Sequence, residues 1–363
     1  MSREEIKVLY YTDPTAFQIF GGAEIQMQKT KEYLEKMNGN VCVKFFDFFK
    51  DELDEYNILH IFQMRPECLS LCKLAKIKGL KIVLSPIYWP ETEIWKYASI
   101  IEKMLSKIRI FYSNFKDYNY LTFKTLYPYK DFLEAADIVV PNSRIEAEVL
   151  SKEFRINPSK FFPVPVGVEG IFANLKPDFF VKKYGLKDFV LFVGRIEQTK
   201  NVLTLLKAYS NIEIPLVIIG HFNLWEHEYF VKCKGLVEHN RNIHYLGFMP
   251  PYSKELLSAY AAAKVFVLPS WHEIPGLCAL EAGLAGCNLV ITDRGSTKEY
   301  FKDYAFYVNP TSVECIKKKI LEAYEKPKDN KLKEHILKNY TWEKTAKRTL
   351  AAYDLALSQA SQN

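Results

Sequence analysis

Two acidic residues, Glu273 and Glu281, stand eight positions apart in the segment Pro269–Glu281, which reads PSWHEIPGLCALE. A Pro-Gly pair interrupts the chain between them, and a helix is expected to begin near Gly276 or Leu277. A helix N-terminus offers N–H groups and a positive dipole end, which suit a diphosphate, and flanking carboxylates can accept hydrogen bonds from sugar hydroxyls. The other interpretation is a helix start with two solvated acids, because acids favour the first turn in any case.

Two basic residues follow a short apolar run in Leu191–Asn201, which reads LFVGRIEQTKN. A strand is expected to end at Gly194, with Arg195 and Lys200 placed before the next helix. Arginine binds oxyanions in a bidentate manner and lysine acts as a point charge, so this order of elements can clamp a diphosphate. The alternative is two surface cations on a loop.

A third candidate is the pair Gly21–Gly22 in FGGAEIQ, which follows the first apolar run and opens a predicted helix. Two glycines let the backbone approach a phosphate or sugar closely. The pattern is not G-x-G-x-x-G, so the nicotinamide-type fingerprint is absent. A simple turn explains the pair equally well.

These residues need elements to position them, and short apolar runs alternate with amphipathic stretches throughout the first half of the chain. Strands that alternate with helices imply parallel βαβ units. We expect strands at Ile6–Tyr11, Val41–Phe46, Ile58–Phe62, Ile82–Leu84 and Ile138–Val140, and helices at Ala23–Met37, Cys68–Lys78 and Ser143–Phe154.

The pattern stops at Phe161–Gly170, whose prolines and glycines predict a hinge, and then restarts. Domains are expected at 1–168, joined by a C-terminal helix at 342–363, and at 169–341, with a ligand cleft between the carboxyl ends of their strands. In the second half we expect strands at Phe189–Val193, Leu216–Ile219, Val265–Leu268 and Asn288–Ile291, and helices at Val202–Tyr209, Leu277–Ala285, Ser312–Glu325 and Trp342–Ser358.

The composition sets the broad class. The 363 residues are 48% apolar and 25% charged, which fits two folded domains and excludes disorder. The net charge of +6 is only mildly basic, so no nucleic-acid partner is expected. No apolar leader stands at the N-terminus, no run of about 18 apolar residues occurs, and seven unpatterned cysteines indicate reduced, buried thiols. We therefore expect a cytoplasmic protein.

Together the three candidate segments resemble the retaining family-4 glycosyltransferases, which have the GT-B fold of two facing Rossmann-like, doubly wound α/β domains with a cleft between them. The resemblance runs from about Gly21 to Tyr353 and is stronger in the second half. It is carried by Gly-Arg-x4-Lys-Asn, by Glu-x-Pro-Gly-x4-Glu-Ala about seventy residues later, by Asp293-Arg294-Gly295-Ser296-x2-Glu299, and by two landmarks, Val140-Pro-Asn-Ser143 and Val164-Pro-Val-Gly-Val168.

The resemblance implies a role for each matching residue. The N-terminal domain is the acceptor side and the C-terminal domain binds a nucleoside-diphosphate sugar, with Arg195 and Lys200 neutralising the departing diphosphate. Glu273 is expected to face the donor sugar. No metal and no cofactor besides the nucleotide-sugar co-substrate are expected, and the sequence contains no Asp-x-Asp triplet. Further donor contacts are expected from Glu281 at the ribose, and from Gly21, Gly22, Gly194, His272, Gly276 and Leu277.

The acceptor side departs from the family pattern. Many relatives carry a His after the strand that here reads IVLSPIYW, and none is present. Ser85, Tyr88 or Trp89 is expected to shape the acceptor side instead. His60 at a strand end is another candidate, although a lone His in such a place is more often a packed core side chain.

The segment Trp95–Lys130 combines ten aromatic residues and seven Lys or Arg with two acids. A basic and aromatic surface can lie on anionic lipid headgroups, so peripheral contact with the inner face of a membrane is one interpretation. Ordinary helix packing with lysines that extend to water is the other.

The function expected from these features is metal-independent transfer of a sugar, with retention, from a nucleoside-diphosphate sugar to a hydroxyl of a glycan or lipid-linked glycan. One alternative is a GT-B-fold phosphorylase or a nucleotide-sugar hydrolase, which shares the sugar–phosphate contacts. The other is a non-catalytic nucleotide- or glycan-binding protein, against which the complete set Arg195, Lys200, Glu273 and Glu281 argues.

Overall fold

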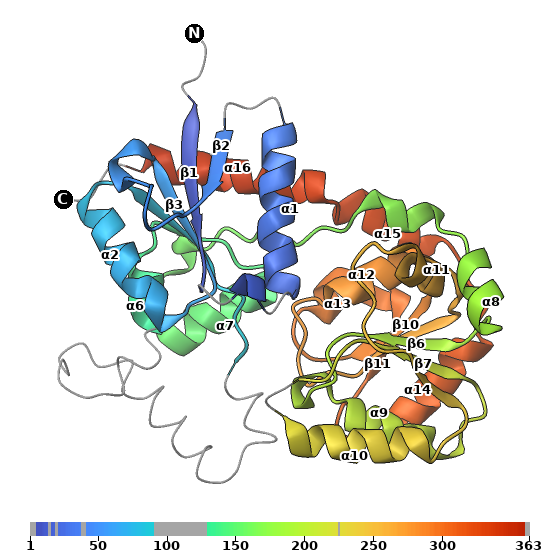
Figure 1. Cartoon of the computed structure of the whole chain (residues 1–363). Helices are drawn as coiled ribbons and strands as arrows, with labels where there is room; N and C mark the ends of the chain where they lie inside the picture. The colour runs from blue at the N-terminus through green and yellow to red at the C-terminus, as the bar shows by residue number, and fades with distance from the viewer. Residues whose placement is uncertain are drawn as a thin grey trace. The chain divides into compact units, whose positions relative to one another are not determined.

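The computed structural model describes residues 5–13, 16–18, 21–37, 41–90, 129–223 and 226–359. The chain divides into two units (Figure 1): unit 1 is Met1–Gly167 with Trp342–Asn363, and unit 2 is Val168–Thr341. Each unit is built on one parallel sheet, as the alternation of strand and helix patterns predicts. The chain thus leaves unit 1 after its first 167 residues and returns to it for a final helix.

The sheet of unit 1 has the strand order β2-β1-β3-β4-β5, and all neighbouring strands are parallel. All five residues of its central strand β3 are buried, as expected for a sheet covered on both faces. None of the seven cysteines forms a disulfide, and Cys42 on β2 is exposed, contrary to the expectation of buried thiols. The strands are β1 (Ile6–Tyr11), β2 (Val41–Phe45), β3 (Ile58–Phe62), β4 (Lys81–Ser85) and β5 (Ile138–Val139).

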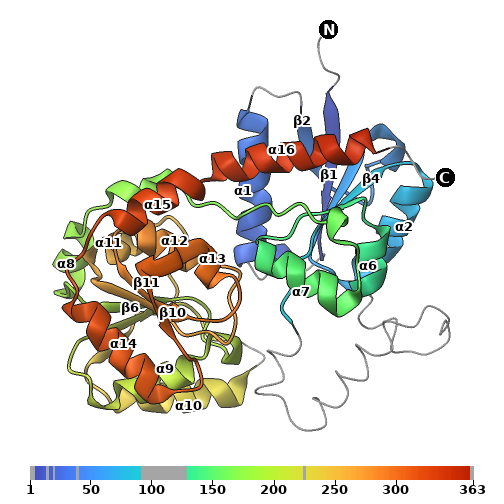
Figure 2. The ribbon, with the colours of Figure 1, turned by 180° about the vertical axis from the view of Figure 1, so that it is seen from behind.

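Helices cover both faces of this sheet, and each face has its own apolar core. One core contains Met27 of α1 and Tyr353 of α16, and Figure 2 shows α16 lying across the strands beside α1. The other contains Cys72 of α2, Phe132 of α6 and Leu150 of α7. These helices are α1 (Gly22–Lys36), α2 (Leu69–Ile77), α6 (Tyr129–Ala135), α7 (Arg144–Phe154) and α16 (Trp342–Ser358).

The landmark Val140-Pro-Asn-Ser143 acts as a structural junction between β5 and α7. The Ser143 hydroxyl caps α7 by accepting from the Glu146 N–H at 2.9 Å, as Ser does at helix starts. The Glu146 carboxylate accepts from the N–H of Asn142 at 2.6 Å and of Tyr88 at 2.7 Å. The amides of Asn142 and Gln26 exchange hydrogen bonds of 2.8 and 3.0 Å, which join this junction to α1.

The second landmark, Val164-Pro-Val-Gly-Val168, is an extended segment whose three valines are buried. The carbonyl of Pro165 accepts from the Thr345 hydroxyl of α16 at 2.8 Å, and the Val168 N–H donates to the backbone carbonyl of Tyr340 at 3.0 Å. Both contacts lie within a unit, the first in unit 1 and the second in unit 2. A hinge in this segment stays a prediction.

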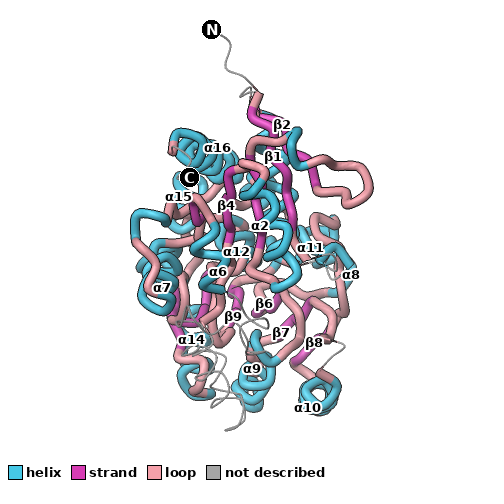
Figure 3. Tube along the Cα trace, turned by 90° about the vertical axis from the view of Figure 1, so that its left-hand side faces the viewer, coloured by secondary structure: helices cyan, strands magenta, loops and turns pink. Residues whose placement is uncertain are grey.

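The sheet of unit 2 has the strand order β11-β10-β9-β6-β7-β8 and is parallel throughout. Figure 3 shows α9, α10 and α14 on one side of these strands and α11 and α12 on the other. Its strands are β6 (Val190–Val193), β7 (Leu216–Ile219), β8 (Ile243–Tyr245), β9 (Val265–Leu268), β10 (Asn288–Thr292) and β11 (Ala305–Val308). Its helices are α8 (Asp178–Tyr184), α9 (Val202–Ala208), α10 (His227–Glu238), α11 (Lys254–Ala262), α12 (Leu277–Leu284), α13 (Thr297–Phe301), α14 (Val313–Glu325) and α15 (Lys331–Asn339).

A buried chain of polar side chains connects the sheet of unit 1 to α16. His60 on β3 is 1% exposed; its Nδ1 bonds the Tyr353 hydroxyl at 2.8 Å and its Nε2 bonds the Ser85 hydroxyl at 2.9 Å. The Tyr353 hydroxyl also lies 3.0 Å from that of Tyr10. Because burial penalises the charged imidazole, the pKa of His60 falls to about 3.

This shift predicts acid sensitivity of unit 1. The unfolded chain binds a proton at His60 near pH 6.5 and the folded chain does not, so the stability held above pH 6.5 is lost as the pH falls towards 3. Below pH 6.5, we expect His60 to lower the free energy of unfolding of the wild type by up to about 1.4 kcal/mol for each unit by which the pH falls. Urea unfolding at pH 7, 6 and 5 measures this slope. The slope should be shallower in His60→Gln, and equal slopes in the two proteins would contradict the assignment.

Candidate functional site

The basic and acidic residues singled out in the sequence follow two neighbouring strands of unit 2. From β6 the chain continues to β7 and β8 on one side, whereas β9, β10 and β11 lie on the other side of β6. The place between two adjacent strands whose connections leave in opposite directions is called the switch point. It is the usual ligand site of a parallel α/β sheet. Arg195 and Lys200 follow β6, and Glu273 follows β9.

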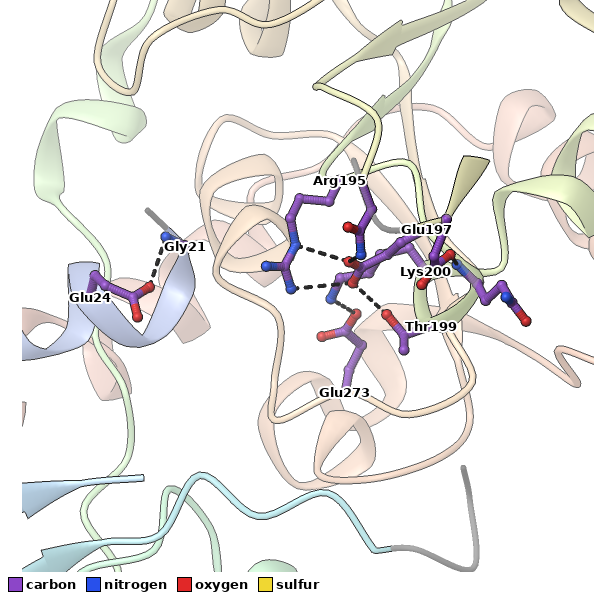
Figure 4. A network of polar contacts seen from close by, with 10 residues as sticks. Gly21, Glu24, Arg195, Glu197, Thr199, Lys200 and Glu273 are labelled. Carbon is purple, nitrogen blue, oxygen red and sulfur yellow. Dashed lines mark hydrogen bonds and ion pairs between the residues drawn. The ribbon is translucent and has the colours of Figure 1, made fainter. Parts of the chain in front are cut away.

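Lys200 and Glu273 contact each other directly across these two loops (Figure 4). The lysine Nζ lies 2.6 Å from Glu273 Oε1, and the two side chains are 21% and 4% exposed. Further hydrogen bonds hold the loops together: the Trp271 N–H donates to the Thr199 carbonyl at 3.0 Å, and the Asn201 side-chain amide donates to the Pro269 carbonyl at 3.0 Å. Hydrogen bonds between the two loops therefore keep Lys200 and Glu273 close together.

Arg195 is held by a residue that the sequence reasoning missed. Its Nε lies 3.1 Å from Glu197 Oε2 and its Nη2 lies 3.2 Å from Glu197 Oε1 (Figure 4). Ile196 between them pairs with Phe222 as a parallel bridge, so the segment is extended and alternate residues share one side. The pattern Arg-Ile-Glu was the available signal, but it is informative only once the segment is known to be extended.

The start of α12 requires the predicted glycine. Gly276 has φ +88°, and a Cβ there would lie 3.0 Å from both Glu273 Oε2 and Leu268 Cδ2. The helix begins at Leu277, as expected, and its first N–H groups have no partner within the helix. An anionic ligand beside Glu273 could therefore reach the N-terminal end of α12.

Gly295 in the Asp-Arg-Gly-Ser motif lets the loop after β10 lie against the backbone of Glu273. The Ser296 N–H donates to the Glu273 carbonyl at 2.9 Å, and Glu273 and Gly295 form a parallel bridge. Gly295 has φ +81°, and a Cβ there would lie 2.1 Å from the Glu273 carbonyl oxygen. Similarly, a Cβ on Gly220 would lie 1.9 Å from the carbonyl oxygen of Gly194. Both glycines are therefore needed for close backbone approach.

Glu281 lies in the second turn of α12 and accepts a hydrogen bond of 2.7 Å from the Tyr260 hydroxyl. Burial raises the pKa of Glu281 to about 7, although the bond from Tyr260 acts in the opposite direction. His272, beside Glu273, is also buried. The expected contacts of Glu281 with ribose and of His272 with the donor sugar stay predictions.

The raised pKa of Glu281 predicts a pH effect opposite in sign to that of His60. The folded chain keeps a proton on Glu281 up to about pH 7 and the unfolded chain loses it near 4.5, so the stability present at pH 4.5 is lost as the pH rises through 7. We expect the free energy of unfolding of wild type, measured relative to Glu281→Gln, to fall by about 1–3 kcal/mol between pH 5 and 8. Chemical unfolding at both pH values tests this, and a constant difference would contradict it.

Gly21 and Gly22 stand at the start of α1 in unit 1. Gly22 is the first helical residue, and the Gly21 N–H donates to the Glu24 carboxylate at 2.8 Å (Figure 4). This bond gives Gly21 a local reason, because a Cβ there would lie 3.2 Å from that same carboxylate oxygen. A contact of these glycines with a donor stays a prediction.

Three of the residues expected on the acceptor side are core side chains of unit 1. His60 and Ser85 are buried and bonded to each other, and Tyr88 is 4% exposed and packs edge-to-face against Tyr129 and Phe154. The packing of His60 agrees with the alternative given for it, a packed core side chain, and contact of these residues with an acceptor stays a prediction.

Trp89 is half-buried, and its expected place on the acceptor side stays a prediction. Nearly all of the basic and aromatic segment 95–130 lies outside the described residues, so its contact with a membrane also stays a prediction. Within the described ranges, no helix combines the length and the apolar character that crossing a bilayer requires.

Comparison with known proteins decides the class of unit 2. The family model of the glycosyl transferases group 1 matches residues 177–341, nearly the whole of that unit. Unit 2 is a glycosyl transferases group 1 domain. Arg195, Lys200, Glu273 and Glu281 all lie within this group 1 domain.

Named relatives agree with the group 1 domain. The chain is 31% identical over 193 residues to O-antigen chain mannosyltransferase B of Escherichia coli, covering 48% of each protein. It is 30% identical over 178 residues to N-acetylgalactosamine-N,N'-diacetylbacillosaminyl-diphospho-undecaprenol 4-alpha-N-acetylgalactosaminyltransferase of Campylobacter jejuni, covering 47% of this chain and 46% of that protein. The chain spans about half the length of these relatives.

The fold is matched over nearly the whole chain. Sucrose-phosphate synthase from Thermosynechococcus elongatus superimposes with a TM-score of 0.75 at 16% identity, covering 96% of this chain and 98% of that structure. The predicted GT-B fold, two Rossmann-like α/β domains of which one is the group 1 domain, is confirmed.

Proposed function

We propose that the protein transfers a sugar from a nucleoside-diphosphate sugar to a hydroxyl of a glycan or lipid-linked glycan. The observation that carries this proposal is the 2.6 Å contact of Lys200 with Glu273 at the switch point of the sheet, within the group 1 domain. A cation beside a buried carboxylate matches the two ends of the donor, an anionic diphosphate and a polyhydroxylated sugar. The named relatives, which transfer mannosyl and N-acetylgalactosaminyl groups, agree with this class of reaction.

Charge stabilisation of the leaving diphosphate is the main catalytic effect that we propose. Arg195 and Lys200 supply fixed positive charge, and the N–H groups at Gly276–Leu277 supply the positive end of α12. Preorganised donors aimed at developing charge are worth about 2.7–4 kcal/mol each in enzymes. With these groups in place the reaction needs no divalent metal, which is part of the proposal.

The carboxylates serve the sugar and the ribose. Glu273 and the neighbouring His272 face the donor sugar, and Glu281 holds the ribose hydroxyls once its proton is lost. In the family that the chain resembles, retention is explained by substitution on the front face of the sugar through an oxocarbenium-like state, and we propose the same mechanism here.

Ligand-induced stabilisation tests the donor class. Thermal unfolding is measured with UDP, GDP and ADP and with their common sugar conjugates; a ligand at 100 times its Kd should stabilise the protein by about 2.7 kcal/mol. The stabilising donor is then incubated alone, with a glycan and with a lipid-linked glycan. Product that forms only with an acceptor, and that still forms in the presence of EDTA, supports the proposal. NMR of that product should show the same anomeric configuration as the donor sugar. Rapid donor loss without acceptor indicates a hydrolase instead.

A further inference from the structure

The carboxylate of Glu197 is buried, with its side chain 5% exposed, in a loop that otherwise carries the cations of the donor site. Three hydrogen-bond donors surround it: Nη2 of Arg195 at 3.2 Å, the Thr199 hydroxyl, and the Asn223 amide at 3.3 Å. Nε of Arg195 makes a further ion-pair contact of 3.1 Å, so both carboxylate oxygens have two partners. Burial of a charged acid is costly unless it is paired, and here the main partner is Arg195.

The backbone makes this pairing specific. Ile196 pairs with Phe222, which places Arg195 and Glu197 on one side of the extended segment and brings Asn223 alongside. With Nη2 bonded to Glu197 and Nε in ion-pair contact with it, the N–H groups left for an anionic ligand are those of Nη1 and the second one of Nη2. The Arg195 side chain is 42% exposed, so its surroundings cover it only in part.

We propose that Glu197 is a positioning residue that fixes the guanidinium of Arg195 for the diphosphate of the donor. The inference rests on the proposed function, because it assumes that Arg195 contacts a diphosphate. Glu197 acts through Arg195 and does not touch the substrate. Its carboxylate holds the planar guanidinium by the Nη2 hydrogen bond and the Nε ion-pair contact, so the outer N–H groups point in a fixed direction and little side-chain freedom is lost when the ligand binds.

The sign of the charge effect makes the proposal testable. Glu197 is an anion close to a site for an anion, so simple electrostatics predicts tighter diphosphate binding when its charge is removed. A positioning role predicts the reverse: Glu197→Gln loses the ion pair that orients Arg195, and diphosphate binding weakens. The affinity of a neutralised variant therefore distinguishes a residue that orients Arg195 from one that only competes with the ligand for it.

The experiment is calorimetric titration of the full chain with UDP, GDP and ADP, continued with the one that binds most tightly. Glu197→Gln is expected to raise its Kd about tenfold, a typical coupling for residues of one ion-pair network. Glu226→Gln is the matched control. The Glu226 carboxylate accepts from the N–H of Gln198, the residue after Glu197, at 2.7 Å, and its replacement also removes one negative charge. The control should bind as tightly as wild type or more tightly.

Arg195→Ala and the double variant Arg195→Ala/Glu197→Gln complete a thermodynamic cycle. If Glu197 acts through Arg195, the second replacement has no further effect on Kd, whereas a role in loop structure alone gives additive losses and overturns the proposal. Unchanged or tighter binding by Glu197→Gln, with weaker binding by Arg195→Ala, also overturns it while the proposed function stands. No effect of Arg195→Ala on any of the three nucleotides is instead a failure of the proposed function. Should Glu197→Gln not fold, Glu197→Asp, which keeps the charge but retracts it, carries the same expectation.

Discussion

Replacement of Lys200 by alanine is expected to lower kcat/KM for sugar transfer by about 10²–10³-fold, the usual effect of removing one group that stabilises a leaving anion. The lysine Nζ forms an ion pair with Glu273, and this pair joins the loops that follow β6 and β9 at the switch point of the sheet. Its removal takes positive charge from the diphosphate and also leaves a 4% exposed carboxylate without its cation. Steady-state kinetics with the donor identified by thermal unfolding gives the measurement.

Two companions of Lys200→Ala separate these effects. Lys182→Ala removes an exposed lysine of α8, beside a separate hollow of about 1040 Å³, and should leave kcat/KM at the wild-type value. Lys200→Ala/Glu273→Gln removes the unpaired charge as well, so it should be more stable than Lys200→Ala but no more active. Wild-type kcat/KM in Lys200→Ala would remove this residue from the proposed mechanism.

Gly295→Ala is expected to be the most destabilising of the substitutions considered, and to inactivate the protein as well. The added Cβ would lie 2.1 Å from the carbonyl oxygen of Glu273, a backbone atom that cannot move without shifting the Glu273 side chain. We expect the free energy of unfolding to fall by more than about 3 kcal/mol, the sum of a left-handed backbone cost and a steric clash. Displacement of Glu273 by about 1 Å should lower kcat about 10²-fold.

A matched control for Gly295→Ala exists in the same unit. Gly286 has φ +86°, close to the +81° of Gly295, but a Cβ there meets nothing within 4 Å. Gly286→Ala should therefore cost only the left-handed backbone term of about 1–2 kcal/mol and leave kcat unchanged. Urea unfolding and the transfer assay on both variants measure the difference, and equal stability losses would show that the close approach at Glu273 is unimportant.

The strands were largely predictable because fully buried strands have a clear sequence pattern. β3, β6, β7, β9 and β10 are buried along their whole length, and each was expected within two residues of its observed bounds. The edge strands β8 and β11 were missed, and most of their residues are not buried. β8, which reads IHY, lacks the continuous apolar run that predicts a buried strand, whereas β11, which reads AFYV, has such a run and was still not predicted.

Lys200 and Glu273 were both predicted as site residues, and the sheet explains why they meet. They are 73 residues apart but follow neighbouring parallel strands, whose carboxyl ends meet at one edge of the sheet. Glu197 escaped notice because its role depends on the pairing of Ile196 with Phe222, which no local pattern announces. The sequence could not supply the partner of His60, because Tyr353 is 293 residues away on a helix at the other end of unit 1's sequence.

The return of the chain to unit 1 for its final helix has a consequence for biosynthesis. Unit 2 is continuous in the sequence, so a chain that extends only to Thr341 already carries its whole core. Unit 1 is still incomplete at that length, because one core on its sheet includes Ala346, Tyr353 and Ala356, and this side of the sheet stays open to water without them. The segment that begins first is thus completed last, and nascent chains stopped after Thr341 should expose the apolar face of β1 and β3 to chaperones.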